Sequence, residues 1–195
     1  MNDLYDKLKE DPLNLLYHFT PVENLESILQ HGILSRSTLD KMKIPYVWND
    51  QQRYDGKFDR ISISPNRTNR RYLRRMIKKY PARDFVRITI FCKILFDDKF
   101  DCLFYPDNAA SKKFSGVPEN RFKGLEALER FLESSSNPDD GIVSLEQREI
   151  MALGPISTNC FSAVIFLNPE SFSKFRSPLL QKRINAYLDL NGVVP

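Results

Sequence analysis

The sequence is poor in the residues that build metal sites and disulfide frameworks. Only three cysteines and two histidines occur among its 195 residues. Cys92, Cys102 and Cys160 are widely spaced and stand among apolar residues, which favours buried, reduced thiols over disulfides or a CxxC metal knuckle. A zinc site would have to combine ligands from distant parts of the chain, so we expect no metal.

Long apolar runs and the common nucleotide-binding and hydrolase motifs are also absent. No stretch approaches the roughly 18 consecutive apolar residues that a membrane helix needs. The first residues, MNDLYDKLKEDPLN, are charged and lack the apolar core of a signal peptide. We therefore expect a cytoplasmic protein without a membrane partner. Because GxGxxG, Walker, HExxH and GxSxG motifs are missing, a nucleotide would have to bind to another scaffold.

The chain has enough apolar sequence for one domain with its own core. At 195 residues and 42% hydrophobic composition, we expect residues 1–195 to form a single domain. Alternating or β-rich stretches predict strands over residues 13–19, 60–64, 83–95, 101–105, 147–152 and 160–167. Helical spacing predicts helices over residues 3–12, 21–31, 36–43, 67–80, 125–132 and 178–190. Helices early and strands late indicate an α+β fold.

The first histidine stands in the run Tyr17-His18-Phe19-Thr20, at the end of the first expected strand. Because side chains alternate along a strand, His18 and Thr20 face the same side, where an imidazole and a hydroxyl can grip a polar ligand. Each residue also has an ordinary structural explanation. His18 could simply bond to backbone, and Thr20 could cap a helix that begins at Pro21 and ends before Gly32.

Two further polar positions suggest group-transfer chemistry. Gln147 and Glu149 fall on one side of an expected strand, the arrangement that a glycosyl-transfer site uses to hold a sugar hydroxyl and receive a proton. An exposed polar strand face is the alternative. Arg53 stands between Asp50 and Asp55 in an expected loop, where its guanidinium could bind a pyrophosphate or pair with the neighbouring aspartates.

Positive charge is concentrated in one part of the chain. Residues 57–79 contain nine basic residues and one acid, a local charge of +8, whereas the rest of the chain sums to −4. Six of them recur at helical spacing and form one stripe: Arg67, Arg70, Arg71, Arg74, Arg75 and Lys78. Like charges placed in this way repel one another, and a nucleic-acid backbone would relieve that repulsion. A solvated helix face is the alternative.

Taken together, the motifs resemble one protein family, the DarT-type DNA ADP-ribosyltransferase toxins. The resemblance covers residues 13–167 and depends on the order of its pieces. These are YHFTPVENLESIL at 17–29, GILS at 32–35, ND at 49–50 with RYDG at 53–56, ISISPN at 61–66, NAAS at 108–111 and QREI at 147–150. Around residues 49–66 and 108–111 the sequence looks closer to the guanine-modifying branch than to the thymidine-modifying one.

The resemblance implies an ADP-ribosyltransferase fold, with a split, mostly antiparallel β core, NAD in the cleft and small helices at the rim. It implies that NAD is a co-substrate whose ADP-ribose passes to guanine or thymine in single-stranded DNA, with release of nicotinamide. It also implies a toxin-antitoxin or phage-defence role and a cognate antitoxin, such as a macrodomain-type (DarG-like) ADP-ribosyl hydrolase. An enzyme acting on RNA, protein or a small molecule, or a non-catalytic nucleic-acid-binding module, remains an alternative.

The resemblance also assigns roles to individual residues. Glu149 would be the catalytic glutamate and Arg53 the catalytic arginine on the phosphates. The other residues expected to bind NAD are His18, Thr20, Asn24, Tyr46, Ser62 and Gln147, with Tyr46 or Trp48 as a wall of the nicotinamide pocket. Residues 114–146 would read the acceptor base. Lys112 and Lys113, together with the stripe over residues 67–78, are expected to contact nucleic-acid phosphates.

Overall fold

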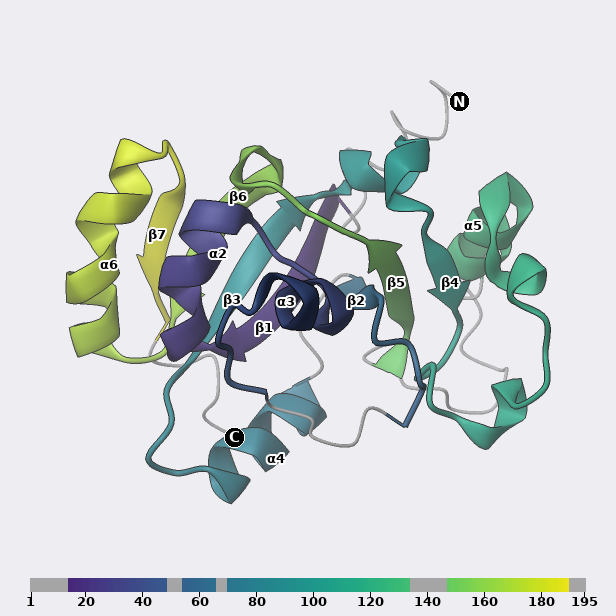
Figure 1. Ribbon diagram of the computed structural model, residues 1–195, viewed down its shortest axis with the longest axis horizontal. Coiled ribbons are helices and arrows are strands. Elements are labelled where there is room, and N and C mark those ends of the chain that lie inside the picture. Colours follow the sequence, from purple (N-terminus) through teal and green to yellow (C-terminus); the bar gives the residue numbers. More distant parts are fainter. Residues whose placement is uncertain (1–13, 49–53, 66–69, 134–146, 190–195) are drawn as a thin grey trace.

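A seven-stranded sheet forms the centre of the computed structural model, which describes residues 14–48, 54–65, 70–133 and 147–189 (Figure 1). In the order β4-β5-β2-β1-β3-β6-β7, all neighbours are antiparallel except β6 and β7. The strands are β1 (Leu15–Pro21), β2 (Arg60–Pro65), β3 (Phe85–Phe91), β4 (Leu103–Tyr105), β5 (Glu149–Leu153), β6 (Phe161–Phe166) and β7 (Asn185–Leu188). The expected α+β fold is confirmed.

Helices lie around the sheet and at its two ends. They are α2 (Leu25–His31), α3 (Arg36–Met42), α4 (Arg70–Lys79), α5 (Gly124–Glu133) and α6 (Pro169–Gln181). Short 3-10 helices cover η2 (Val22–Asn24), η3 (Cys92–Phe96), η4 (Asp98–Phe100), η5 (Lys112–Phe114), η6 (Glu119–Phe122) and η8 (Thr158–Cys160). In Figure 1, α6 accompanies β7 at one end of the sheet and α5 accompanies β4 at the other. Residues 3–12, expected to be helical, lie outside the described part of the chain.

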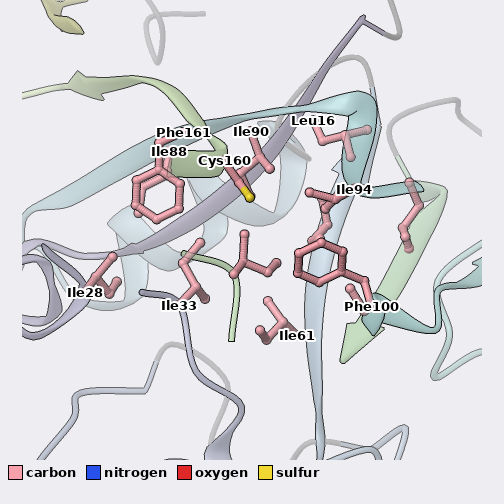
Figure 2. Close-up of a cluster of buried hydrophobic side chains, with 14 of the residues drawn as sticks. Leu16, Ile28, Ile33, Ile61, Ile88, Ile90, Ile94, Phe100, Cys160 and Phe161 are labelled. Atoms are coloured by element: carbon pink, nitrogen blue, oxygen red, sulfur yellow. The ribbon is translucent and has the colours of Figure 1, made fainter. Parts of the chain in front are cut away.

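The apolar core lies where the central strands meet α2 and the short helices. Figure 2 shows side chains from β1, α2, β2 and β3 converging with Phe100 and Phe161. Ile88 and Ile90 of β3 are completely buried. Burial of one such side chain stabilises the fold by about 1.5–3 kcal/mol. Strand β3, which lies between β1 and β6 in the sheet, is buried at six of its seven positions.

The three cysteines are buried and free, as the sequence predicted. Burial raises the pKa of Cys102 to about 12, so this residue remains a neutral thiol at physiological pH. Such a thiol is a poor nucleophile and a poor metal ligand, and Cys102 therefore contributes to the core and not to chemistry.

Strands β1 and β2 are paired at one end only. The register joins Leu16 to Pro65 and Tyr17 to Ser64, whereas β1 pairs with β3 along its whole length. Among the described residues no further pairing of β1 with β2 follows Tyr17. At this point His18 Nδ1 donates a hydrogen bond to the backbone carbonyl of Ser62 at 2.9 Å. A side chain thus satisfies a carbonyl that the neighbouring strand leaves open, and β1 and β2 separate after this point.

The expected helix cap at Thr20 is wrong. Thr20 belongs to β1 and pairs with Val86 of β3, because strand pairing continues to Pro21. The Thr20 hydroxyl accepts a hydrogen bond from Asn24 Nδ2 at 2.8 Å and caps no helix. Gly32 does end α2, with φ at 79°. A Cβ at Gly32 would lie 2.5 Å from the carbonyl oxygen of Ile156, so the close approach of the two backbones requires glycine.

Three other elements had wrong boundaries. The C-terminal helix begins at Pro169, where Asn168 caps it by accepting a hydrogen bond from the Glu170 amide at 2.7 Å. The helix ends at Gln181, and residues 185–188, expected to be helical, form β7 parallel to β6. The strand expected over 83–95 stops at Phe91, where η3 begins. The strand expected from Gln147 begins at Glu149. The expected helices over 36–43 and 125–132 are confirmed as α3 and α5.

Candidate active site

A cavity of about 210 Å³ opens where β1 and β2 separate. Its walls come from β1, α2, the loop before and after α3, β2, the turn after β4 and the start of β5. Seven residues expected to be catalytic or to bind NAD line this one cavity: His18, Thr20, Asn24, Tyr46, Ser62, Gln147 and Glu149. The sheet therefore brings together residues that lie more than a hundred positions apart in the sequence.

The carboxylate of Glu149 lies in the cavity and is held through both of its oxygens. Its Oε1 accepts a hydrogen bond from the Ser62 hydroxyl. Its Oε2 accepts a hydrogen bond from the backbone amide of Ala109 at 2.9 Å. Each carboxylate oxygen thus has a donor from a different segment, and the orientation of the carboxylate is fixed before any ligand arrives.

Gln147 reaches the cavity by a route that the sequence did not predict. It lies in a helical turn just before β5 and not on the strand itself. The alternation that should place Gln147 beside Glu149 therefore does not apply. Gln147 nevertheless lines the same cavity, because the chain turns toward it before the strand begins.

His18 contributes an imidazole with a defined tautomer. The Ser62 carbonyl can only accept a hydrogen bond, so His18 Nδ1 carries the proton. In the neutral ring Nε2 is then the acceptor. His18 therefore bridges the split between the two strands and lines the cavity at the same time.

Asn24 holds the loop that forms one wall of the cavity. Its Nδ2 donates to the Val47 carbonyl at 2.7 Å, and its Oδ1 accepts from the Val47 amide at 2.8 Å. Arg83 fastens the end of the same loop, because its Nη1 donates to the Trp48 carbonyl at 3.1 Å. The Asn24 amide is thus engaged with protein on both sides, and it shapes the wall that carries Tyr46 and Trp48.

Tyr46 lines the cavity from this loop as a neutral phenol. Burial raises its pKa above the usual value, and the charge and hydrogen bond of Asp40 act in the same direction. Tyr46 can therefore donate a hydrogen bond from its hydroxyl throughout the physiological pH range.

The sequence did not reveal the Ala109 amide or the contribution of Tyr72. A backbone donor leaves no trace in residue type, so no motif could have identified Ala109. Tyr72 lies on α4, packs on Phe19 with ring centroids 5.6 Å apart and lines the cavity. Its helical spacing alone gave no reason to separate it from the core residues of the helix.

The expected nucleic-acid-binding residues lie on two surfaces. Helix α4 packs on the core through Leu73 and Met76 and leaves Arg74, Arg75 and Lys78 exposed. Lys112 and Lys113 are exposed on η5, where Lys113 Nζ lies 3.0 Å from Asp107 Oδ2. Arg53, Arg67 and residues 134–146 lie outside the described part of the chain, as do the side chains of Arg70 and Arg71.

Within the described ranges, no group of three or more potential metal-ligating side chains is found. The helices of the same ranges include none that is long and apolar enough to cross a membrane.

Comparison with known proteins identifies a family and a shared fold. The family model described as ssDNA thymidine ADP-ribosyltransferase, DarT, matches residues 17–189. A search of curated protein sequences returned no match.

Three solved structures resemble the chain over more than nine tenths of its length. Thermosipho africanus DarTG in complex with ADP-ribose has a TM-score of 0.62 and 18% identity, covering 92% of this chain and 51% of that one. The chain thus spans about half of that relative. Thermus sp. 2.9 DarT in complex with NAD⁺ has a TM-score of 0.61 and 11% identity, covering 92% and 97%. Its complex with ADP-ribosylated ssDNA has a TM-score of 0.67 and 10% identity, covering 93% and 97%. At these identities the structures establish the common fold.

Proposed function

The chain belongs to the DarT family of ssDNA ADP-ribosyltransferases, and we propose that it transfers ADP-ribose from NAD⁺ to a nucleobase of single-stranded DNA, releasing nicotinamide. One observation carries the proposal. Glu149 lies in a cavity with its carboxylate oriented by Ser62 and Ala109, and His18 and Thr20 line the same cavity. The Thermus sp. 2.9 relatives in complex with NAD⁺ and with ADP-ribosylated ssDNA support the choice of substrates.

Glu149 has the position and the charge for the central step. When the bond between the ribose C1′ and the nicotinamide nitrogen breaks, positive charge develops on the ribose, and a fixed carboxylate stabilises it. The bond from C1′ to a nitrogen of the acceptor base then forms, and the proton of that nitrogen passes to Glu149. Nicotinamide leaves as a neutral molecule, so no metal or redox partner is needed.

The neighbouring residues have complementary roles in this proposal. His18 and Thr20 contact the ribose and nicotinamide region, and Tyr46 and Trp48 form the wall against which the nicotinamide ring packs. Gln147 binds the ribose hydroxyls beside Glu149, and Ser62 contributes by holding the carboxylate. Asn24 acts through the wall loop. On the resemblance, Arg53 holds the pyrophosphate by bidentate hydrogen bonds.

The acceptor base is proposed to be guanine or thymine. The description of the matching family names thymidine as the acceptor. The sequence around residues 49–66 and 108–111 instead resembles the guanine-modifying branch. Two single-stranded oligonucleotides decide between the bases, one with a single guanine and one with a single thymine in an otherwise unreactive sequence. Mass spectrometry of each oligonucleotide shows whether ADP-ribose has been attached.

A toxin role in the cytoplasm follows as a further part of the proposal. As a toxin the protein needs a neutralising antitoxin, and a macrodomain-type hydrolase that removes ADP-ribose from DNA fits this chemistry. The name DarTG of the Thermosipho africanus relative supports such a pairing. Growth arrest on expression that is relieved by co-expression of an ADP-ribosyl hydrolase tests it.

The decisive experiment combines labelled NAD⁺ separately with single-stranded DNA, duplex DNA, RNA and a protein extract. We expect label on single-stranded DNA and an equal amount of released nicotinamide, both lost in Glu149→Gln. Label on RNA or protein alone would reassign the acceptor. Nucleic-acid binding without any nicotinamide release would identify a binding module and overturn the enzymatic proposal.

A further inference from the structure

A backbone amide inside a short turn that follows β4 is one of the donors that orient Glu149. In this turn the Asn108 amide donates to Asp107 Oδ1 at 2.7 Å, and the Ala110 amide donates to Asn108 Oδ1 at 2.8 Å. The Ser111 amide donates to the Asn108 carbonyl at 2.8 Å. Three amides of residues 108–111 are therefore used to close the turn, and the fourth, that of Ala109, points across to Glu149 Oε2.

The turn is held from its polar side by Asp107. Besides accepting from the Asn108 amide, the Asp107 carboxylate accepts from Lys113 Nζ at 3.0 Å through Oδ2. The Asp107 side chain is only 14% exposed, whereas that of Lys113 is 64% exposed. Asp107 thus connects the first amide of the turn to η5, the next element of the chain.

The opposite side of the turn is held by apolar contacts. Ala109 is 9% exposed and belongs to a cluster with Tyr105 and Phe122. The rings of Tyr105 and Phe122 are 4.3 Å apart, and Phe114 lies 5.3 Å from Phe122. The side chain of Ala109 is therefore anchored in a small core, and rotation of its peptide plane is controlled by the polar bonds on the other side.

We propose that Asp107 is a positioning residue for the catalytic carboxylate: by closing the 107–111 turn it aims the Ala109 amide at Glu149 Oε2. The inference rests on the proposed function in that Glu149 must be the catalytic group. Asp107 does not line the cavity and has no direct contact with the substrate in this scheme. It acts through Ala109, so its removal lowers turnover and leaves the binding of NAD⁺ intact.

Two substitutions separate the roles of the Asp107 oxygens. Asp107→Ala removes both acceptors, whereas Asp107→Asn keeps one amide oxygen for the Asn108 amide and gives up the ion pair with Lys113. Asp97 offers a matched control elsewhere on the fold. Its carboxylate also accepts from a backbone amide, that of Lys99 at 3.2 Å, and pairs with the Lys99 ammonium group, but it lies outside the cavity.

The experiment measures steady-state nicotinamide release with single-stranded DNA present, together with thermal unfolding of each variant. Asp107→Ala should lower kcat roughly 10- to 100-fold, as expected for a misplaced catalytic group, with the KM for NAD⁺ changed less than about 2-fold. Asp107→Asn should restore most of the turnover, and Asp97→Ala should match the wild type. If Asp107→Ala turns over normally, or if KM rises while kcat is kept, the positioning role is wrong.

A measurement without turnover distinguishes this failure from failure of the proposed function. In ¹⁵N-labelled protein, Glu149→Gln should shift the amide proton of Ala109 upfield, because a carboxylate is the stronger acceptor. Asp107→Ala should shift the same resonance in the same direction, and Asp107→Asn should not. An unchanged Ala109 resonance in Asp107→Ala would overturn the positioning role. If the variants show these shifts but the wild-type protein cleaves no NAD⁺, the catalytic role of Glu149 is wrong, and with it the function proposed for Asp107.

Discussion

The Ser62 hydroxyl of β2 donates a hydrogen bond to the carboxylate of Glu149, 87 residues further along the chain. The register between the strands explains the contact, because Ser62 pairs with Met151 and Glu149 lies two residues before it on the same face. The pairing of β2 with β5 therefore sets the geometry of the acidic group as well as the stability of the sheet.

Replacing Ser62 with alanine removes this donor from Glu149. We expect Ser62→Ala to lower kcat for ADP-ribose transfer roughly 10- to 100-fold, since a charge-assisted hydrogen bond contributes about 1.5–3 kcal/mol. Steady-state kinetics with varied NAD⁺ measures the effect. Ser62→Thr keeps a hydroxyl and serves as the control. A rise in KM alone would show that Ser62 binds NAD⁺ directly and does not act through Glu149.

The carboxylate of Glu149 itself should be indispensable. Glu149→Gln keeps the shape of the side chain and removes its negative charge, so we expect transfer to fall by roughly 10²- to 10⁴-fold while the melting temperature stays near that of the wild type. Glu133→Gln, at the exposed end of α5, is the control and should be fully active. Comparable activity of the two variants would contradict the catalytic assignment.

Asn24 should affect the binding of NAD⁺ more than turnover. Asn24→Asp keeps the acceptor for the Val47 amide but loses the donor to the Val47 carbonyl and to Thr20. The wall that carries Tyr46 and Trp48 is then held less firmly, and we expect the KM for NAD⁺ to rise roughly 5- to 10-fold. Isothermal titration with NAD⁺ checks the same effect. Unchanged affinity with reduced kcat would instead indicate that the loop acts in the chemical step.

The exposed basic residues of α4 should account for part of the salt dependence of DNA binding. Replacing Arg74, Arg75 and Lys78 with glutamine should weaken single-stranded DNA binding and reduce the slope of log K against log salt by about 0.7 for each lost phosphate contact. The triple replacement of Lys174, Arg176 and Lys182 removes the same charge from exposed positions in and after α6. Equal slopes for both triple variants would exclude α4 from the DNA interface.

The ion pair of Lys57 with Glu119 should stabilise the fold within a defined pH window. A hydrogen bond from Lys57 lowers the pKa of Glu119 below its usual 4.5 and outweighs the opposing effect of burial. Burial alone would lower the pKa of Lys57, but Glu119 and Tyr105 raise it above 10.5. The ion pair therefore contributes fully to the free energy of unfolding between two pH limits. These limits are the pKa values that Glu119 and Lys57 have in the unfolded chain. The contribution is lost as pH falls through the depressed pKa or rises through the elevated one.

Thermal unfolding at several pH values tests this window. Glu119→Gln should be less stable than the wild type at neutral pH by about 0.2–1 kcal/mol, since the Glu119 side chain is 50% exposed. The difference should shrink on acidification below about pH 4.5. Glu129→Gln, at an exposed position of α5, is the control and should show no such dependence. A difference that persists in acid would mean that Glu119 stabilises the fold by another route.

Local patterns in the sequence were sufficient for much of the fold. The alternation in residues 60–64 predicted β2, and helical spacing predicted α2, α3 and α5. The alternation of side chains also put His18 and Thr20 on one face, and both line the cavity. These features depend on neighbours within a few residues, and the physical reason is that the periods of strands and helices are properties of the backbone itself.

The remaining features were decided by contacts between distant segments. Pairing with β3 made Thr20 a strand residue instead of a helix cap, and the open edge of β6 converted residues 185–188 into a strand. Asn24 gained its partners only when the loop with Val47 folded onto it. The amide that orients Glu149 comes from the backbone of Ala109, and any residue except proline could provide it. By itself the sequence determined which side chains were available and which face of its element each one takes. Only the tertiary structure decided which backbone groups meet them, because long-range hydrogen bonds depend on register and not on residue type.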